Sequence, residues 1–136
     1  MSEREGFLDT CTVVHLEALA EDLPAVAHVS EVTMCELEAG VATAQTDELR
    51  SARRARLDAI RRIAIVHPLD ADCSRAFAQV AADLRLHGRK VSARSYDALI
   101  AATAIANGLP LFTTNPGDFQ HIDGLDLRAL ESPDGA

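Results

Sequence analysis

The sequence between residues 97 and 119 reads DALIAATAIANGLPLFTTNPGDF, and this stretch decides the fold. Its first part is apolar almost all round, which predicts a buried helix over Tyr96–Asn107 with a cap at Ser95. Asn107-Gly108 ends that helix, Leu111–Thr113 reads as a short strand, and Asn115-Pro116-Gly117 is a turn. A buried helix that leads directly into a strand is typical of an α/β domain.

The same alternation runs through the rest of the chain. Further strands are expected over Phe7–Leu8, Val26–Ser30, Ile63–His67 and Leu125–Leu130. Further helices are expected over Thr10–Glu21, Val32–Ala42 and Asp47–Ile63, and from a cap at Asp70 or Asp72 to His87, before Gly88. The apolar anchors expected in the long helix are Leu49, Leu57, Ile60 and Ile63. Strands that alternate with helices predict an α/β domain with a mainly parallel sheet covered on both faces.

The composition fits one globular domain. The chain has 136 residues, of which 48% are hydrophobic but only 4% aromatic, so small aliphatic side chains must fill the core. We expect a single domain over residues 1–131 and a flexible tail over residues 132–136. We expect no signal peptide, because Asp9 interrupts the first apolar run, and no membrane span, because no apolar stretch approaches about 20 residues.

Cysteine and histidine usage argues against several kinds of site. Cys11, Cys35 and Cys73 are odd in number and lack a Cys-x-x-Cys spacing, as is typical of reduced thiols in a cytoplasmic protein. The five histidines show no mutual spacing that suits a metal site. We find neither a Gly-rich phosphate loop nor a motif for a serine or cysteine nucleophile.

The net charge of −8 is unfavourable for a protein that binds nucleic acid, because phosphates are normally met by an excess of Lys and Arg. The basic residues are, however, unevenly placed. Six of the 13 fall between Arg50 and Arg62, and three more are Arg89, Lys90 and Arg94. A site that binds divalent cations must itself be acidic, so the net charge does not decide the question.

Four carboxylates stand at the ends of elements or in apolar surroundings: Asp9, Glu36, Asp97 and Asp118. Ligands of open α/β sheets bind outside the carboxyl ends of the strands, which is where Asp9 and Asp118 fall. Each carboxylate also has a purely structural explanation. Asp9 could cap a helix, Glu36 could lie on a solvated face, Asp97 could favour the helix dipole, and Asp118 could belong to the turn.

A shared acidic site would indicate metal chemistry. Carboxylates that come together raise each other's pKa, and a divalent cation removes that penalty. Oxygen ligands without His or Cys suit Mg²⁺ or Mn²⁺. Such ions orient a phosphodiester, activate a water and stabilise the leaving oxygen, so a nuclease is the function that this set of residues favours.

Four segments resemble the motifs of PIN-domain nucleases, and of the VapC toxin family in particular, in the same order. They are FLDT (7–10), VTMCELEAG (32–40), DALIAATA (97–104) and TTNPGDF (113–119). The resemblance spans about residues 7 to 130. It implies a three-layer α/β/α sandwich with a short, mainly parallel central sheet. It also implies a metal-dependent endoribonuclease that acts as the toxin of a type II toxin–antitoxin pair.

The resemblance assigns roles by position. Asp9 and Asp97 would be the principal ligands of Mg²⁺ or Mn²⁺, and Glu36 and Asp118 would complete the acidic cluster. As polar supports, Thr113 and Asn115 would orient the acids or a phosphate. The expected partners are an RNA substrate, a second copy of the chain in a homodimer, and a cognate VapB-like antitoxin that covers the site.

Two features depart from the commoner family pattern. Cys11 stands where a small polar residue is usual, which weakens any hydrogen bond from that position to the site. The stretch between Gly88 and Asp97 is longer and more basic than in many members. From it, Arg89, Lys90 and Arg94 are candidates for binding RNA phosphates, and a solvated loop between helices is the alternative explanation. The Arg50–Arg62 helix could bind RNA, carry a solvated face or receive the antitoxin.

Two other functions remain open at this stage. One is a PIN-like module that binds RNA or protein without catalysis. The other is a phosphatase with Asp9 as nucleophile. That mechanism usually needs a second acid two residues later, where this chain has Cys11.

Overall fold

The computed structural model describes residues 4–133, apart from the side chains of Ala93 and Arg94. Its strands are β1 (Glu5–Leu8), β2 (Val26–Ser30), β3 (Ile65–His67), β4 (Leu111–Thr113) and β5 (Leu127–Ala129). Its α-helices are α1 (Thr10–Val14), α2 (Glu31–Ala42), α3 (Asp47–Ile63), α4 (Ala71–Leu86) and α5 (Ser95–Ala106). Two 3₁₀ helices, η1 (Val91–Arg94) and η2 (Pro116–Phe119), precede α5 and follow β4. The expected alternation of strands and helices is confirmed.

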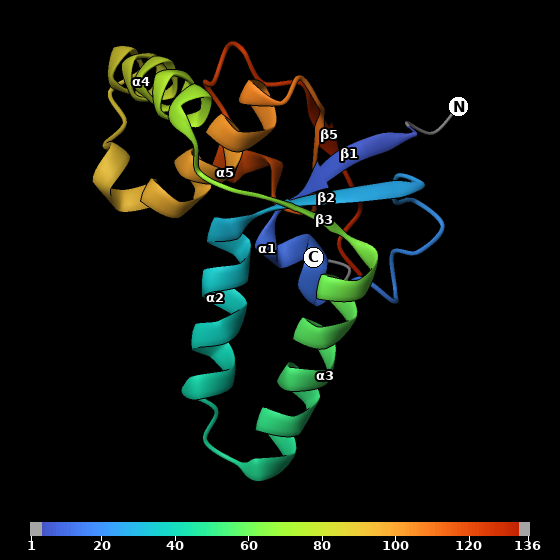
Figure 1. Cartoon of the computed structure of the whole chain (residues 1–136). Coiled ribbons are helices and arrows are strands. Elements are labelled where there is room, and N and C mark those ends of the chain that lie inside the picture. Colours follow the sequence, from blue (N-terminus) through green and yellow to red (C-terminus); the bar gives the residue numbers. More distant parts are fainter. Residues whose placement is uncertain (1–3, 134–136) are drawn as a thin grey trace.

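The five strands form one parallel sheet in the order β3-β2-β1-β4-β5. Helices α4 and α5 lie on one side of this sheet, and α1, α2 and α3 lie on the other (Figure 1). The molecule is therefore the three-layer sandwich that the resemblance implied. Across residues 4–133, no helix combines the length and the apolar character that crossing a membrane requires.

Each face of the sheet has its own apolar core. Successive residues of a strand point to opposite faces, so neighbouring residues of β1 and β4 enter different cores. Phe7 and Leu111 pack with residues of α4 and α5, whereas Leu8 and Phe112 pack with residues of α1, α2 and α3. Both faces are buried, which explains why these strands read as continuous apolar runs.

Local signals account for most helix ends. The Thr46 side chain caps α3 by accepting a hydrogen bond from the Leu49 N–H at 3.1 Å, and Asp70 caps α4 in the same way. Gly88 and Gly108 follow α4 and α5 with φ angles of 71° and 66°, a conformation that glycine adopts without strain. The expected bounds of α3, the expected cap of α4 at Asp70 and the expected stops before Gly88 and Gly108 are thus confirmed.

The expected helix over Thr10–Glu21 is wrong in length, because α1 ends at Val14. The His15 N–H turns back to the Thr12 carbonyl oxygen at 3.1 Å, and separate turns follow it as far as Asp22. The apolar residues of this segment do not share one buried face. Val13 and Leu19 are buried, whereas Val14 is 39% exposed, so no single stripe holds a longer helix against the core.

Three smaller expectations also need correction. Ser95 does not cap α5, because η1 runs directly into the helix and leaves Ser95 with helical backbone angles. Of the four apolar anchors expected in α3, Leu57 and Ile60 are buried, but Leu49 and Ile63 are exposed. Strand β3 is shorter than expected because Ile63 still belongs to α3. Strand β5 is also shorter than expected. Part of the expected tail, residues 134–136, lies outside the described residues.

Candidate functional site

Asp9 lies at the centre of the sheet, directly after the carboxyl end of β1. From β1 the chain proceeds to β2 and β3 on one side, and β4 and β5 lie on the other side. The junction between β1 and β4 is the point where the strand order reverses, and such points are the usual ligand sites of open α/β sheets. Asp9 is only 3% exposed there, so its carboxylate is held in place by the protein.

Three donors fix the Asp9 carboxylate. The Thr12 N–H donates to Oδ1 at 3.0 Å, and the Thr12 hydroxyl donates to the same oxygen. The Thr113 hydroxyl, which reaches across from the end of β4, donates to Oδ2 at 2.7 Å. Asp9 is thus the N-cap of α1, as its structural explanation required, and is also tied to the neighbouring strand. The cap leaves each carboxylate oxygen with further acceptor capacity.

Burial raises the pKa of Asp9 above its ordinary value. The hydrogen bonds from Thr12 and Thr113 act in the opposite direction, because they stabilise the charged form. The negative charge of Asp118 raises the pKa of Asp9 further. Hydrogen bonds therefore favour the charged form of Asp9, whereas burial and the charge of Asp118 oppose it, and the net effect is a raised pKa.

Three of the four acids act electrostatically on the Cys11 thiol. Burial is the main cause that raises the pKa of this thiol, and the negative charges of Asp9, Asp118 and Asp97 raise it as well. A hydrogen bond with the Asn115 side chain acts in the opposite direction. The charges that act on this exposed thiol thus come from the end of β1, from the turn after β4 and from the first turn of α5.

Glu36 is connected to this group through the residue that follows Asp9. The Thr10 hydroxyl lies 2.7 Å from Glu36 Oε1 and 3.2 Å from the hydroxyl of Thr33, which is fully buried. The half-buried Glu36 side chain is therefore held on the inner side of α2 rather than on a fully solvated face.

The turn after β4 holds the remaining expected residues. The Thr113 hydroxyl accepts a hydrogen bond from the Asn115 N–H at 2.9 Å while it donates to Asp9. The Asp118 N–H then donates to the Asn115 carbonyl oxygen at 3.0 Å, which forms the start of η2. One chain of contacts thus joins Asp9, Thr113, Asn115 and Asp118.

The basic residues fall into two groups. Arg89 and Lys90 lie between α4 and η1, whereas the Arg94 side chain lies outside the described residues. On α3, most arginines already have partners: Arg50 binds Asp47, Arg54 and Arg61 bind Glu38, and Arg53 donates to the Gly40 carbonyl oxygen at 2.7 Å.

The donor chemistry of the site fits a hard divalent cation, although the described residues do not form a closed cage. Within residues 4–133, no group of three or more His, Cys, Asp or Glu side chains is arranged to hold a metal ion. Mg²⁺ does not need such a cage, because it keeps several waters and binds through one or two carboxylates plus substrate phosphates. Three hydrogen-bond donors orient the Asp9 carboxylate, and the charge of Asp118 acts against its ionisation. Asp9 therefore suits the role of such a ligand.

Two threonines and two histidines make contacts that the sequence did not predict. The Thr12 and Thr10 hydroxyls hold Asp9 and Glu36, and only the spacing between Asp9 and Thr12 carried a signal, that of a helix cap. Away from the site, His28 and His67 come from neighbouring strands, and their ring nitrogens lie 2.8 Å apart. Their contact follows from the register of β2 and β3, which no spacing along the chain reveals.

Comparison with known proteins gives consistent matches over most of the chain. The PIN domain family matches residues 7–125. Ribonuclease VapC5 of Mycobacterium tuberculosis is 35% identical over 123 residues, which are 88% of this chain and 88% of that protein. Ribonuclease VapC1 of Rickettsia felis is 29% identical over 108 residues, which are 79% of each.

Solved structures share the fold. A chain from VapBC-5, a member of the VapBC family of toxin–antitoxin systems from Mycobacterium tuberculosis, superposes with a TM-score of 0.78 at 32% identity. That similarity covers 95% of this chain and 99% of the other. A chain of VapBC2 from Rickettsia felis, solved bound to a DNA fragment from the promoter, has a TM-score of 0.76 at 22% identity, covering 93% and 99%. The second similarity concerns the fold alone.

Proposed function

The chain belongs to the PIN-domain family, and from this premise we propose that it is a metal-dependent endoribonuclease. We propose further that it acts as the toxin of a type II toxin–antitoxin pair. The support is the similarity to ribonuclease VapC5 along most of both chains, together with the fold shared with VapBC-5.

One observation carries this proposal most strongly. Asp9 is a buried carboxylate at the reversal point of the sheet, and the charges of Asp9, Asp118 and Asp97 all act on the Cys11 thiol. Burial and the charge of Asp118 oppose the ionisation of Asp9, and a bound cation would remove that penalty. Hard oxygen ligands then favour Mg²⁺ or Mn²⁺ over softer ions.

Each residue has a distinct role in this proposal. Asp9 and Asp97 hold the cation, and Glu36 and Asp118 complete the acidic cluster directly or through water. When bound, the ion orients the phosphodiester, activates a water and stabilises the leaving oxygen. Thr113 keeps the Asp9 carboxylate pointed at the site through its 2.7 Å hydrogen bond, and also holds the Asn115 backbone N–H.

The similarity to VapBC-5 supports an antitoxin as one of the proposed partners. We place the protein in the cytoplasm, where its RNA substrate is found, as a homodimer that a VapB-like antitoxin inhibits. VapBC-5 is a member of the VapBC family of toxin–antitoxin systems. Arg89, Lys90 and Arg94 are proposed to bind RNA phosphates beside the acids, which an Ala substitution of all three tests through the salt dependence of RNA binding.

Cleavage of total bacterial RNA by antitoxin-free protein tests the function. The assay contains Mg²⁺, Mn²⁺ or EDTA, and compares the wild type with Asp9→Asn and Asp97→Asn. Asp58→Asn is the matched control, because it makes the same chemical change at an exposed position of α3. Calorimetric titration with Mn²⁺ measures metal binding independently of activity.

We expect discrete fragments in Mg²⁺ or Mn²⁺ that disappear with EDTA and in both site variants, but not in Asp58→Asn. Mn²⁺ binding should weaken in the same two variants. Absence of cleavage from folded protein under every metal would instead favour the non-catalytic binding module. Cleavage that survives in both variants would mean that the site is wrongly assigned, and a covalent phosphoryl-enzyme would favour the phosphatase.

A further inference from the structure

A groove runs along α3 and leads to the acidic cluster. One part, of about 400 Å³, lies between α3 and the segment that follows α1, and its walls include Val14, Glu17, Ala52 and Arg56. A second part, of about 470 Å³, lies between α2 and α3 and is lined by Thr10, Glu36 and Arg53 among others. Val14, Ala52 and Arg56 line both parts, so the two form one continuous surface, which we call the α3 groove.

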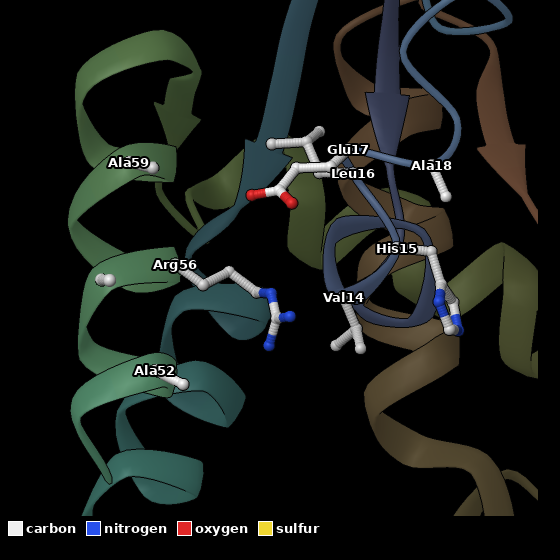
Figure 2. Close-up of a pocket in the computed structure, with 9 residues that line it drawn as sticks. Val14, His15, Leu16, Glu17, Ala18, Ala52, Arg56 and Ala59 are labelled. Atoms are coloured by element: carbon white, nitrogen blue, oxygen red, sulfur yellow. The ribbon is translucent and has the colours of Figure 1, made fainter. Parts of the chain in front are cut away.

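Arg56 stands at the middle of the α3 groove. Figure 2 shows its side chain reaching from α3 toward Val14 and Glu17 on the opposite wall. Within residues 4–133, no ion pair holds its guanidinium, whereas Arg50, Arg54 and Arg61 of the same helix are all paired with carboxylates. Arg56 is half-buried, so its charge lies at the groove and is less fully hydrated than that of an exposed arginine.

The next cation along the groove is Arg53, on the side of Glu36. One of its guanidinium nitrogens donates to the Gly40 carbonyl oxygen at 2.7 Å, which fixes the group and leaves its other N–H donors available. The walls between the two arginines are aliphatic, with Val14, Leu37 and Ala52. Two cations above an apolar floor form a site for a phosphate whose sugar and base lie against the floor.

We propose that Arg56 and Arg53 form a subsite for a phosphate of the RNA strand next to the cut, so that the α3 groove binds the substrate. This inference rests on the proposed function. A strand whose reacting phosphate lies at the acids must place its neighbouring nucleotides in adjoining grooves, and this groove opens onto Glu36 and Thr10.

The other carboxylate of the groove sets the limit of the subsite. Glu17 lies only in the part between α3 and the segment after α1, where its charge opposes a second phosphate. The phosphate is therefore placed between Arg56 and Arg53, on the side of Glu36. An apolar protein segment could also fill such a groove, but it would leave the Arg56 charge without a partner.

The test measures binding of a labelled single-stranded RNA in the Asp9→Asn background, in which the proposed chemistry is blocked. Arg56→Ala is compared with Arg62→Ala, a substitution of the same charge on the same helix at an exposed residue outside the groove. Dissociation constants are determined over a range of salt concentrations. Circular dichroism melting shows that both variants are folded, and cleavage by the wild type is measured separately.

Arg56→Ala should weaken binding about tenfold at low salt, as expected for a lost charge-assisted contact. It should also reduce the slope of log K against log salt by about 0.7, the value for one phosphate of a single strand. Arg62→Ala should change affinity less than about twofold, as is usual for a surface side chain without a specific contact.

Two results would overturn the subsite. Equal effects of Arg56→Ala and Arg62→Ala would mean that only net charge matters. A loss of affinity with an unchanged salt slope would exclude a phosphate contact. If the wild type cleaves RNA in each case, the proposed function stands although the subsite fails. An absence of both binding and cleavage would refute the two together.

Discussion

Thr113→Val removes one hydroxyl from the centre of the site and preserves the size of the side chain. Thr113 is fully buried at the end of β4. Its hydroxyl donates to Asp9 Oδ2 at 2.7 Å and accepts from the Asn115 N–H at 2.9 Å. Valine can replace neither contact, so the substitution separates the polar role of the residue from its packing.

The expected magnitude follows from these two bonds. A hydrogen bond to a charged group contributes about 1.5–3 kcal/mol, and one between neutral groups contributes about 0.5–1.5 kcal/mol. The buried methyl group of valine offsets part of this loss, so the free energy of unfolding should fall by about 1–3 kcal/mol. Partners that orient a metal ligand typically change metal affinity or activity by about 10–100-fold, and we expect Mn²⁺ affinity and RNA cleavage to fall within that range.

Thr103→Val is the matched control for this measurement. Thr103 is equally buried, and its hydroxyl donates to the Leu99 carbonyl oxygen at 2.8 Å, within α5. Urea unfolding, Mn²⁺ calorimetry and cleavage rates are measured for both variants. Both should lose stability, but only Thr113→Val should lose metal affinity. If Thr113→Val binds Mn²⁺ and cleaves RNA like the control, its hydroxyl merely stabilises the fold and the reasoning is refuted.

Three further outcomes are expected from urea unfolding. Burial raises the pKa of Asp9 above its ordinary value of 3.8. The metal-free wild type should therefore gain stability as the pH falls from the raised pKa toward 3.8, and Asp9→Asn should lack this gain. Parallel pH profiles of the two proteins would contradict this prediction. Gly6→Ala places a Cβ 2.4 Å from Cε1 of the buried Phe112 ring and should cost about 1–3 kcal/mol, whereas Gly117→Ala, with open space around it, should cost less. Thr46→Ala removes the cap of α3 and should cost about 1 kcal/mol, which Thr46→Ser should largely restore.

The fold could be predicted where local and periodic signals agree. Helix α3 begins and ends at the expected residues. Thr46 caps its start, and Leu57 and Ile60 of its expected apolar anchors are buried, although Leu49 and Ile63 are exposed. The segment after α1 was predicted wrongly for the opposite reason. Its apolar residues fit a helical period, but packing buries Val13 and Leu19, exposes Val14 and leaves the chain in separate turns. Tertiary contacts decide such short segments, and a single sequence does not contain them.

The site could be predicted as a set of acids but not as a network. The positions of Asp9 and Asp118 after strands were enough to place them at one edge of a parallel sheet. The threonines that hold the acids were visible only in part, because a hydroxyl carries no signal until its partner is known. Thr113 meets Asp9 across 104 positions of the chain, and Thr10 meets Glu36 across 26. Such contacts depend on strand order and helix packing.

The arrangement around Asp9 also explains how an acidic protein could act on RNA. A carboxylate at the reversal point of the sheet must lose hydration, and the charges beside it make ionisation still less favourable. Three donors compensate for part of this loss, but hydrogen bonds cannot cancel the repulsion between carboxylates. A divalent cation can cancel it, and bound cations reverse the local sign of the electrostatic field. The free energy that opposes ionisation of Asp9 in the metal-free protein would therefore favour a bound cation. In the proposed function, that cation would in turn attract a phosphodiester despite the net charge of −8.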